Sequence, residues 1–172
     1  MKKILFILGT ARKGRASKKV FDYVLSLARK RSDFEPLAVD VMDFLQSKTF
    51  GLPKNKLTKW KSIVSISDAI VIISPEYNHG YPGELKMLLD SEYEAYAGKV
   101  VAICGVSSGI FGGARMVEQL KLVLNALQMT VLGASVYFSN VDQLFDDIGQ
   151  IKDMKWDKKI DEMFDKLIEH IK

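Results

Sequence analysis

The 172-residue sequence has few of the side chains that build disulfide bonds or metal centres. Cys104 is its only cysteine, so no intrachain disulfide can form, and its two histidines, His79 and His170, are widely separated. No cluster of cysteines and histidines has the spacing of a metal site, and we expect no bound metal. A chain without a disulfide framework is typical of a reducing compartment, so we expect a cytoplasmic protein.

Long hydrophobic runs and a strong net charge are missing as well. The apolar run at residues 4–8 follows two lysines, but it is only five residues long. A signal peptide needs about 7–15 apolar residues and a membrane helix about 20, so we predict a buried strand here and no membrane partner. The formal net charge of +4 comes from scattered lysines and arginines. Without a basic stripe we expect no nucleic-acid partner, although small anions such as phosphates are favoured.

Short apolar runs alternate with segments of helical spacing along the chain. The apolar runs lie at residues 4–8, 37–41, 69–73, 100–106 and 130–138, and the helical segments at 17–31, 57–67, 83–90, 114–127 and from 152 onward. The run Ala69–Ile73 is almost entirely β-branched, as a strand covered on both faces requires. We therefore predict one α/β domain over residues 1–172, a three-layer sandwich with a five-stranded parallel sheet between helices.

The loop at residues 9–17, between the first strand and the first helix, has the composition of a phosphate site. It contains three cations, Arg12 and Arg15 among them, and two more lysines follow in the first turn of the helix. A helix N-terminus already carries about half a positive charge, so each cation there is unfavourable by ~0.3–1 kcal/mol unless an anion lies among them. A phosphate would resolve this by accepting bonds from backbone N–H groups, from the hydroxyls of Thr10 and Ser17, and from Arg12.

Other interpretations of this loop remain open. Ser17 can be a simple helix N-cap, with the basic residues forming a solvated turn. The spacing of Gly9 and Gly14 resembles a P-loop, but Arg15 and Ala16 stand where lysine and a hydroxyl residue are required. The G-x-G-x-x-G dinucleotide pattern is also absent, because alanine stands at its second glycine.

Two further loops are suited to close approach of a ligand. We expect the strand order 2-1-3-4-5, in which the loops after the first and third strands flank the point where strand order reverses, and ligands bind there. Residues 74–83 offer two tyrosines, an amide and glycines, stiffened by two prolines, as a rim for a flat heterocycle. Residues 105–115 are small and hydroxyl-rich at another helix start. Each loop alone could be a plain structural turn, but their coincidence at one end of the sheet favours a binding site.

The three loops together resemble those of the NAD(P)H-dependent FMN reductase family, a flavodoxin-like group that includes quinone, azo-dye and chromate reductases. The Gly-Ser/Thr-x-Arg loop of that family corresponds to residues 9–17, its Pro-Glu-Tyr-Asn segment to residues 75–90, and its third signature to residues 107–113. The resemblance covers most of the chain and implies a flavodoxin-like fold. It also implies cofactor-binding residues in all three loops: Thr10, Arg12, Arg15 and Ser17 toward the FMN phosphate, Pro75, Glu76, Tyr77 and Asn78 along the isoalloxazine ring, and Ser107, Ser108 and Gly109 on its other side. Arg15 is a departure, because many relatives have serine there.

Three reactive side chains are assigned no chemistry. His79 is interpreted as a surface residue that shapes its turn, with proton donation as the alternative. We expect Glu76 to point away or to make a structural hydrogen bond, because its carboxylate would repel a reduced, anionic flavin. Cys104 lies inside the fourth predicted strand and is interpreted as buried apolar filler.

The resemblance implies an enzyme in which FMN takes hydride from NAD(P)H and passes electrons to a small-molecule acceptor in a ping-pong cycle. No residue is assigned a catalytic role, because the flavin supplies the chemistry. A homodimer or homotetramer is expected, with Tyr77, Tyr81, Tyr93 and Tyr96 facing a partner. One alternative is a non-enzymatic FMN electron carrier, which the net positive charge disfavours, since such carriers are typically acidic. Another is a scaffold that has lost the cofactor.

Overall fold

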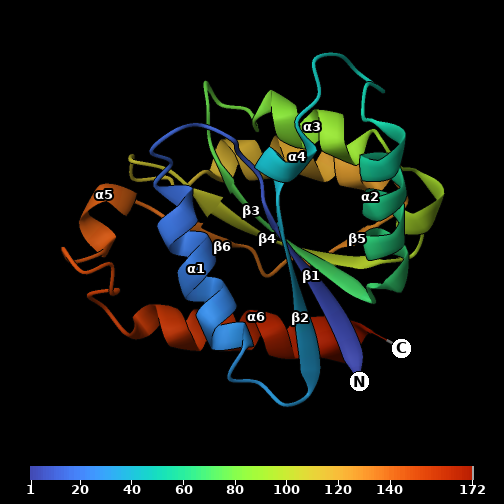
Figure 1. The fold of residues 1–172 in the computed structure, drawn as a ribbon. Helices are drawn as coiled ribbons and strands as arrows, with labels where there is room; N and C mark the ends of the chain where they lie inside the picture. Colours follow the sequence, from blue (N-terminus) through green and yellow to red (C-terminus); the bar gives the residue numbers. More distant parts are fainter. Residues whose placement is uncertain (172) are drawn as a thin grey trace.

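A parallel sheet runs through the centre of the computed structural model, which describes residues 1–171 (Figure 1). Its strands are β1 (Lys2–Leu8), β2 (Phe34–Asp40), β3 (Ala69–Pro75), β4 (Val100–Val106), β5 (Thr130–Val131) and β6 (Val136–Phe138). All strand pairs are parallel, and their order is β2-β1-β3-β4-β5, with β6 also paired to β4. The predicted parallel sheet and its 2-1-3-4-5 order are confirmed.

The fifth position of the sheet is divided, although the sequence predicts one strand over residues 130–138. Thr130 and Val131 pair with the start of β4, and residues 136–138 pair with its end. Gly133 lies in the gap between the two pieces and is exposed. Glycine weakens a strand because it has no side chain to pack and loses more backbone entropy than other residues, which is consistent with a break at the edge of the sheet.

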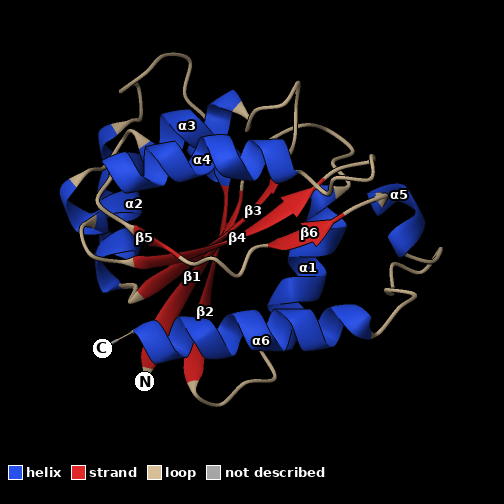
Figure 2. Ribbon diagram, turned by 180° about the vertical axis from the view of Figure 1, so that it is seen from behind, coloured by secondary structure: helices blue, strands red, loops and turns tan. Residues whose placement is uncertain are grey.

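Helices cover both faces of the sheet (Figure 2). On one face α1 (Ser17–Ala28) and α6 (Lys155–His170) pack against the strands, and on the other face lie α2 (Lys54–Ile66), α3 (Gly83–Leu89) and α4 (Ala114–Ala126). Short helical turns complete the chain at η1 (Val41–Phe44), η2 (Glu94–Tyr96) and α5 (Val141–Leu144). The predicted three-layer sandwich is therefore confirmed, and each long helix begins or ends within a few residues of its predicted limits.

The strands divide their side chains between two hydrophobic cores. In β1 the residues Phe6 and Leu8 face α1 and α6, whereas Leu5 and Ile7 face the other three helices, and all four are fully buried. Alternate strand residues point to opposite faces, which explains why an unbroken apolar run is needed here. Burying one such side chain stabilises the fold by about 1.5–3 kcal/mol.

Two sequence predictions about single residues have different outcomes. Cys104 is fully buried in β4, as predicted, and desolvation raises the pKa of its thiol to about 12. Tyr96 is also fully buried, so the prediction that it faces a partner subunit is wrong. Its ring packs near Trp60 with centroids 6.5 Å apart, and the short turn η2 directs it into the core rather than outward.

Candidate functional site

A cavity of about 370 Å³ opens at the carboxyl ends of the central strands, where the predicted loops meet. The β1–α1 loop, the end of β3, the β4–α4 loop and the start of α5 surround it. Its lining residues are Arg12, Gly14, Arg15, Ala16, Ser17, Pro75, Glu76, Tyr77, Val106, Ser107, Ser108, Val141 and Asp142. The predicted residues Thr10, Asn78 and Gly109 do not belong to this lining. The three loops singled out from the sequence therefore do form one concave surface.

The hydroxyl of Ser17, in the cavity lining, is buried and has no hydrogen-bond partner in the described residues. Ser17 as a whole is 1% exposed. The N-cap of α1 is Ala16, and no side chain caps this helix. The interpretation of Ser17 as a simple N-cap is therefore wrong, and its buried hydroxyl is left available.

Backbone N–H groups beside Ser17 are available as well. In the described part of the chain, no residue accepts a hydrogen bond from the amides of residues 13–17. The first bonds of the turn are made by Lys18, which donates to the carbonyl of Arg15, and by Lys19, which donates to that of Ala16. Unpaired amides at a helix N-terminus, together with the helix dipole, form a site for an anion.

The two arginines of the loop have different surroundings. Arg12 is exposed, and its guanidinium lies 5.7 Å from the centroid of the Tyr77 ring. Arg15 instead forms a two-pronged ion pair with Asp40 at the end of β2, including an Nη1–Oδ1 bond of 2.9 Å, and also donates to the carbonyl of Thr10. Arg15 lines the cavity, but its guanidinium is already used to hold the loop. Sequence reasoning did not foresee Asp40 as its partner.

Thr10 lies behind the cavity rather than in it. It is fully buried, and its hydroxyl donates to Glu84 Oε1 at 3.0 Å and lies 3.1 Å from the hydroxyl of Tyr77. Its one proton is therefore given to a carboxylate inside the protein. We revise its expected role from a direct phosphate contact to support of the loop.

The segment after β3 begins in the cavity and then turns away from it. Tyr77 and Gly80 exchange two backbone hydrogen bonds, of 2.9 and 3.0 Å. Between them Asn78 and His79 have positive φ values of 49° and 68°, as a type I′ turn requires. Both are exposed and outside the cavity lining, so the predicted contact of Asn78 with a ring is not supported. His79 shapes the turn, in agreement with its interpretation.

Glu76 makes the structural hydrogen bonds expected of it. Its side chain is 6% exposed and pairs with Arg115 at the start of α4, with contacts of 2.5 and 2.8 Å. It also accepts a 3.4 Å hydrogen bond from the backbone of Met116. The Arg115 guanidinium lies over Phe111, so this pair fastens the β4–α4 loop to the end of β3.

The β4–α4 loop is fastened on its other side by α5, which the sequence did not predict. The backbone N–H of Asn140 donates to the carbonyl of Gly109, and that of Val141 to the carbonyl of Ser107, both at 3.1 Å. These bonds bring Val141 and Asp142 into the cavity lining. No periodic pattern marks residues 140–151, so only the cavity itself identifies them.

Two other types of site are not seen in the described residues. Among residues 1–171, no group of three or more histidine, cysteine, aspartate or glutamate side chains could hold a metal ion. Within the same range, every helix is too short or too polar to pass through a lipid bilayer.

Comparison with known proteins places the chain in a family. The sequence model of the NADPH-dependent FMN reductases matches residues 2–143. The chain belongs to this family. The resemblance seen in the three loop motifs is thereby confirmed.

Relatives and solved structures agree with this membership in the NADPH-dependent FMN reductase family. An NAD(P)H-dependent FMN reductase of Schizosaccharomyces pombe is 33% identical over 139 residues, which cover 75% of this chain and 68% of the relative. A quinone reductase of Pseudomonas putida is 26% identical over 164 residues, covering 87% and 84% of the two chains. The structure of a flavoenzyme NAD(P)H:acceptor oxidoreductase from Paracoccus denitrificans superposes with a TM-score of 0.82 at 23% identity, covering 99% and 97%. That likeness shows that the fold is shared.

Proposed function

We propose that this chain binds FMN in the cavity and uses it to move reducing equivalents from NAD(P)H to a small acceptor such as a quinone. Membership in the FMN reductase family supports the cofactor, and the quinone reductases among the relatives support the type of acceptor. The observation that carries the proposal is the buried, unpartnered hydroxyl of Ser17 beside the free amides of residues 13–17. We further propose one FMN-binding domain over residues 1–172 and a cytoplasmic location.

The phosphate end of the cavity has the donors that a flavin phosphate needs. A buried hydroxyl without a partner costs about 1–3 kcal/mol, and a phosphate oxygen could accept its proton. The amides of residues 13–17 could bind the other oxygens, and the dipole of α1 favours the negative charge. Arg12, which has no carboxylate partner among the described residues, could add a charge-assisted bond.

The cavity could also hold a flat ring. Its lining includes Pro75 and Tyr77 from the end of β3 and the segment after it, and Ser107 and Ser108 from the β4–α4 loop. The cavity volume of about 370 Å³ is within the range of small-molecule sites, about 300–1,000 Å³. When bound there, FMN would supply the redox chemistry, because it can accept a hydride from NAD(P)H and give electrons to an acceptor.

The protein residues orient the substrates and need not transfer protons. The carboxylate of Glu76 is paired with Arg115, and His79 lies outside the cavity lining, so neither is assigned a catalytic role. NAD(P)H and the acceptor would both have to reach the same bound flavin. We therefore propose that they use the cavity in turn, as in a ping-pong cycle.

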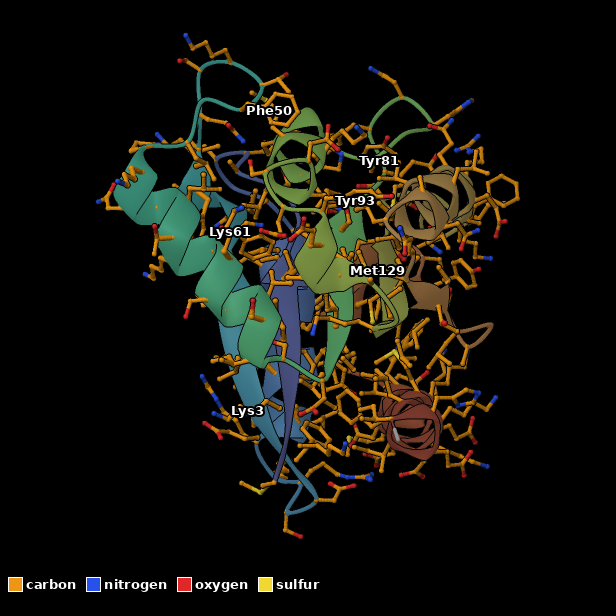
Figure 3. The ribbon with its side chains drawn as sticks, turned by 90° about the vertical axis from the view of Figure 1, so that its right-hand side faces the viewer. Lys3, Phe50, Lys61, Tyr81, Tyr93 and Met129 are labelled. Atoms are coloured by element: carbon orange, nitrogen blue, oxygen red, sulfur yellow. The ribbon has the colours of Figure 1, made fainter. Side chains whose placement is uncertain are left out.

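A homodimer or homotetramer is also proposed. Tyr93 is 54% exposed and Ile110 is 73% exposed, so both side chains could contact a partner subunit. Figure 3 labels Tyr81 and Tyr93 on the side of the molecule that carries α3 and α4. Light scattering of the active protein tests this proposal, and a fully active monomer would contradict it.

Reduction of the flavin by NAD(P)H tests the proposed activity. The purified protein is loaded with FMN, freed of excess flavin, and mixed anaerobically with NADH or NADPH while the flavin absorbance is recorded. If the protein is a reductase, NAD(P)H rapidly abolishes the absorbance of the bound flavin, and addition of a quinone restores it. If the protein is an electron carrier, it binds FMN but the flavin absorbance does not change. A scaffold without cofactor binds no FMN. Parallel lines in double-reciprocal plots of rate against each substrate would support the ping-pong order.

A further inference from the structure

Glu84, in the first turn of α3, accepts hydrogen bonds from the loop at residues 9–17, which we call the phosphate loop. Its Oε1 accepts a hydrogen bond from the Thr10 hydroxyl at 3.0 Å and another from the backbone N–H of Ala11 at 2.8 Å. These bonds join segments that are 74 and 73 positions apart in the sequence. Glu84 does not line the cavity, so any effect that it has on a ligand must pass through the loop.

Counting protons fixes the direction of the hydrogen bonds at Thr10. A threonine hydroxyl has one proton, and an ionised carboxylate can only accept. Because Thr10 donates to Glu84, the 3.1 Å contact between the hydroxyls of Thr10 and Tyr77 must use the tyrosine proton. The backbone N–H of Arg12 also donates to Thr10 Oγ1, at 3.3 Å. The Thr10 hydroxyl is therefore fully used, and it fixes both Tyr77 and the loop backbone.

Tyr77 extends this arrangement to the cavity. Its ring lies under the guanidinium of Arg12, 5.7 Å from ring centroid to Cζ, and both residues line the cavity. A guanidinium over an aromatic face is held by electrostatic attraction to the ring. A continuous set of contacts thus runs from the Glu84 carboxylate through Thr10 and Tyr77 to Arg12.

We propose that Glu84 is a positioning residue for the phosphate of bound FMN, acting through Thr10 and Tyr77 on Arg12 and on the backbone of the phosphate loop. This inference rests on the proposed function. Both hydrogen bonds to Glu84 end on the same oxygen, so a glutamine at this position can accept both with its amide oxygen. An alanine can accept neither. The acceptor atom, rather than the negative charge, is therefore the property that matters.

Titrations with FMN and with riboflavin test the proposal, because riboflavin has the same ring system and no phosphate. We expect Glu84→Ala to weaken FMN binding by about tenfold or more and riboflavin binding by less than about threefold. We expect Glu84→Gln to stay within about threefold of the parent protein for both flavins. Glu118→Ala is the matched control, because Glu118 is exposed on α4 and pairs with Lys121 outside the cavity; it should change neither affinity.

Several outcomes would overturn the proposal. Unchanged FMN affinity in Glu84→Ala would do so, and so would equal losses for FMN and riboflavin, since these indicate a general loosening of the fold. A loss of FMN affinity in Glu84→Gln as large as in Glu84→Ala would show that the negative charge of Glu84, and not its acceptor atom, supports binding.

If Glu84→Ala does not fold, Thr10→Val takes its place, because it removes the linking hydroxyl; the same losses of FMN and riboflavin affinity are expected. If the parent protein binds neither flavin, the proposed function itself fails and this inference fails with it.

Discussion

Replacing Ser17 by alanine is expected to change folding and FMN binding in opposite directions. In the flavin-free protein the Ser17 hydroxyl is 1% exposed and has no partner in the described residues, which costs about 1–3 kcal/mol. Alanine removes this cost. We therefore expect Ser17→Ala to raise the free energy of unfolding of the flavin-free protein by about 1 kcal/mol, or the melting temperature by about 2–4 °C for a chain of this size.

The same substitution removes a donor from the bound phosphate. Hydrogen bonds to charged groups contribute about 1.5–3 kcal/mol, which corresponds to about a 10- to 150-fold change in affinity. We expect the Kd for FMN to rise by about tenfold or more, and the added stability of the flavin-bound form to fall accordingly. A gain in apoprotein stability with a loss in affinity is typical of a residue that is kept for binding.

Circular dichroism melting of the flavin-free proteins and fluorescence titration with FMN measure the two effects. Ser26→Ala is the matched control on the same helix, because Ser26 is exposed and its hydroxyl donates to the carbonyl of Tyr23 at 2.7 Å. It reports the gain that alanine gives to α1 by helix propensity, less the loss of this exposed hydrogen bond. The reasoning is refuted if flavin-free Ser17→Ala is less stable than Ser26→Ala, or if its FMN affinity equals that of the parent.

Further substitutions and chemical probes test other parts of the structure. Arg12→Ala should weaken FMN binding by about tenfold with little change in apoprotein stability, as followed by the same titration; unchanged affinity would contradict its assignment to the phosphate. Because burial raises the pKa of the Cys104 thiol to about 12, it should resist a thiol reagent at pH 8 until the protein is unfolded, and fast labelling of native protein would contradict its burial. Burial alone would raise the pKa of the Glu92 carboxyl. Hydrogen bonds from the backbone N–H of Ala95 and from the Lys61 side chain have the larger combined effect, so the pKa is lowered below the ordinary 4.5. The ionised Glu92 carboxylate therefore stabilises the fold above that pH, and this stabilisation is lost on acidification. Glu92→Gln should flatten the decline of the free energy of unfolding below about pH 5, as measured by acid titration monitored by circular dichroism. An unchanged decline would contradict this.

The fold could be predicted because its main signals are periodic. Strands buried on both faces, such as β3 and β4, must be apolar throughout, and the helices between them must have one apolar stripe. Once the sheet is parallel, the geometry places the loops after β1, β3 and β4 at the same edge. The position of the cavity follows from that argument without knowledge of any side-chain contact.

Side-chain partners could not be predicted in the same way. The bond from Thr10 to Glu84 and the ion pair of Arg15 with Asp40 join residues 74 and 25 positions apart, and no local pattern marks either pair. Tyr96 was mistaken for a surface residue because a loop tyrosine has the same composition signal whether it points inward or outward. Val141 and Asp142 were missed because their place in the lining depends on hydrogen bonds made by the backbone of α5 to a distant loop.

The phosphate loop shows why a count of charges is weaker evidence than the state of individual donors. The sequence has five cations between residues 12 and 19, and all five favour the prediction that an anion binds there. In the structure Arg15 is neutralised by Asp40, and Lys18 pairs with Asp22 one turn further along α1. Those two cations therefore have carboxylate partners without a ligand. The repulsion between cations and the dipole at the start of α1 is smaller than the sequence alone predicts. The hydroxyl of Ser17 and the amides of residues 13–17 are different, because nothing in the described chain satisfies them, and only a bound acceptor or water can. Since a buried hydroxyl and unpaired amides lie within five consecutive residues at one helix N-terminus, an anion of several oxygens could satisfy more of them than a single water could.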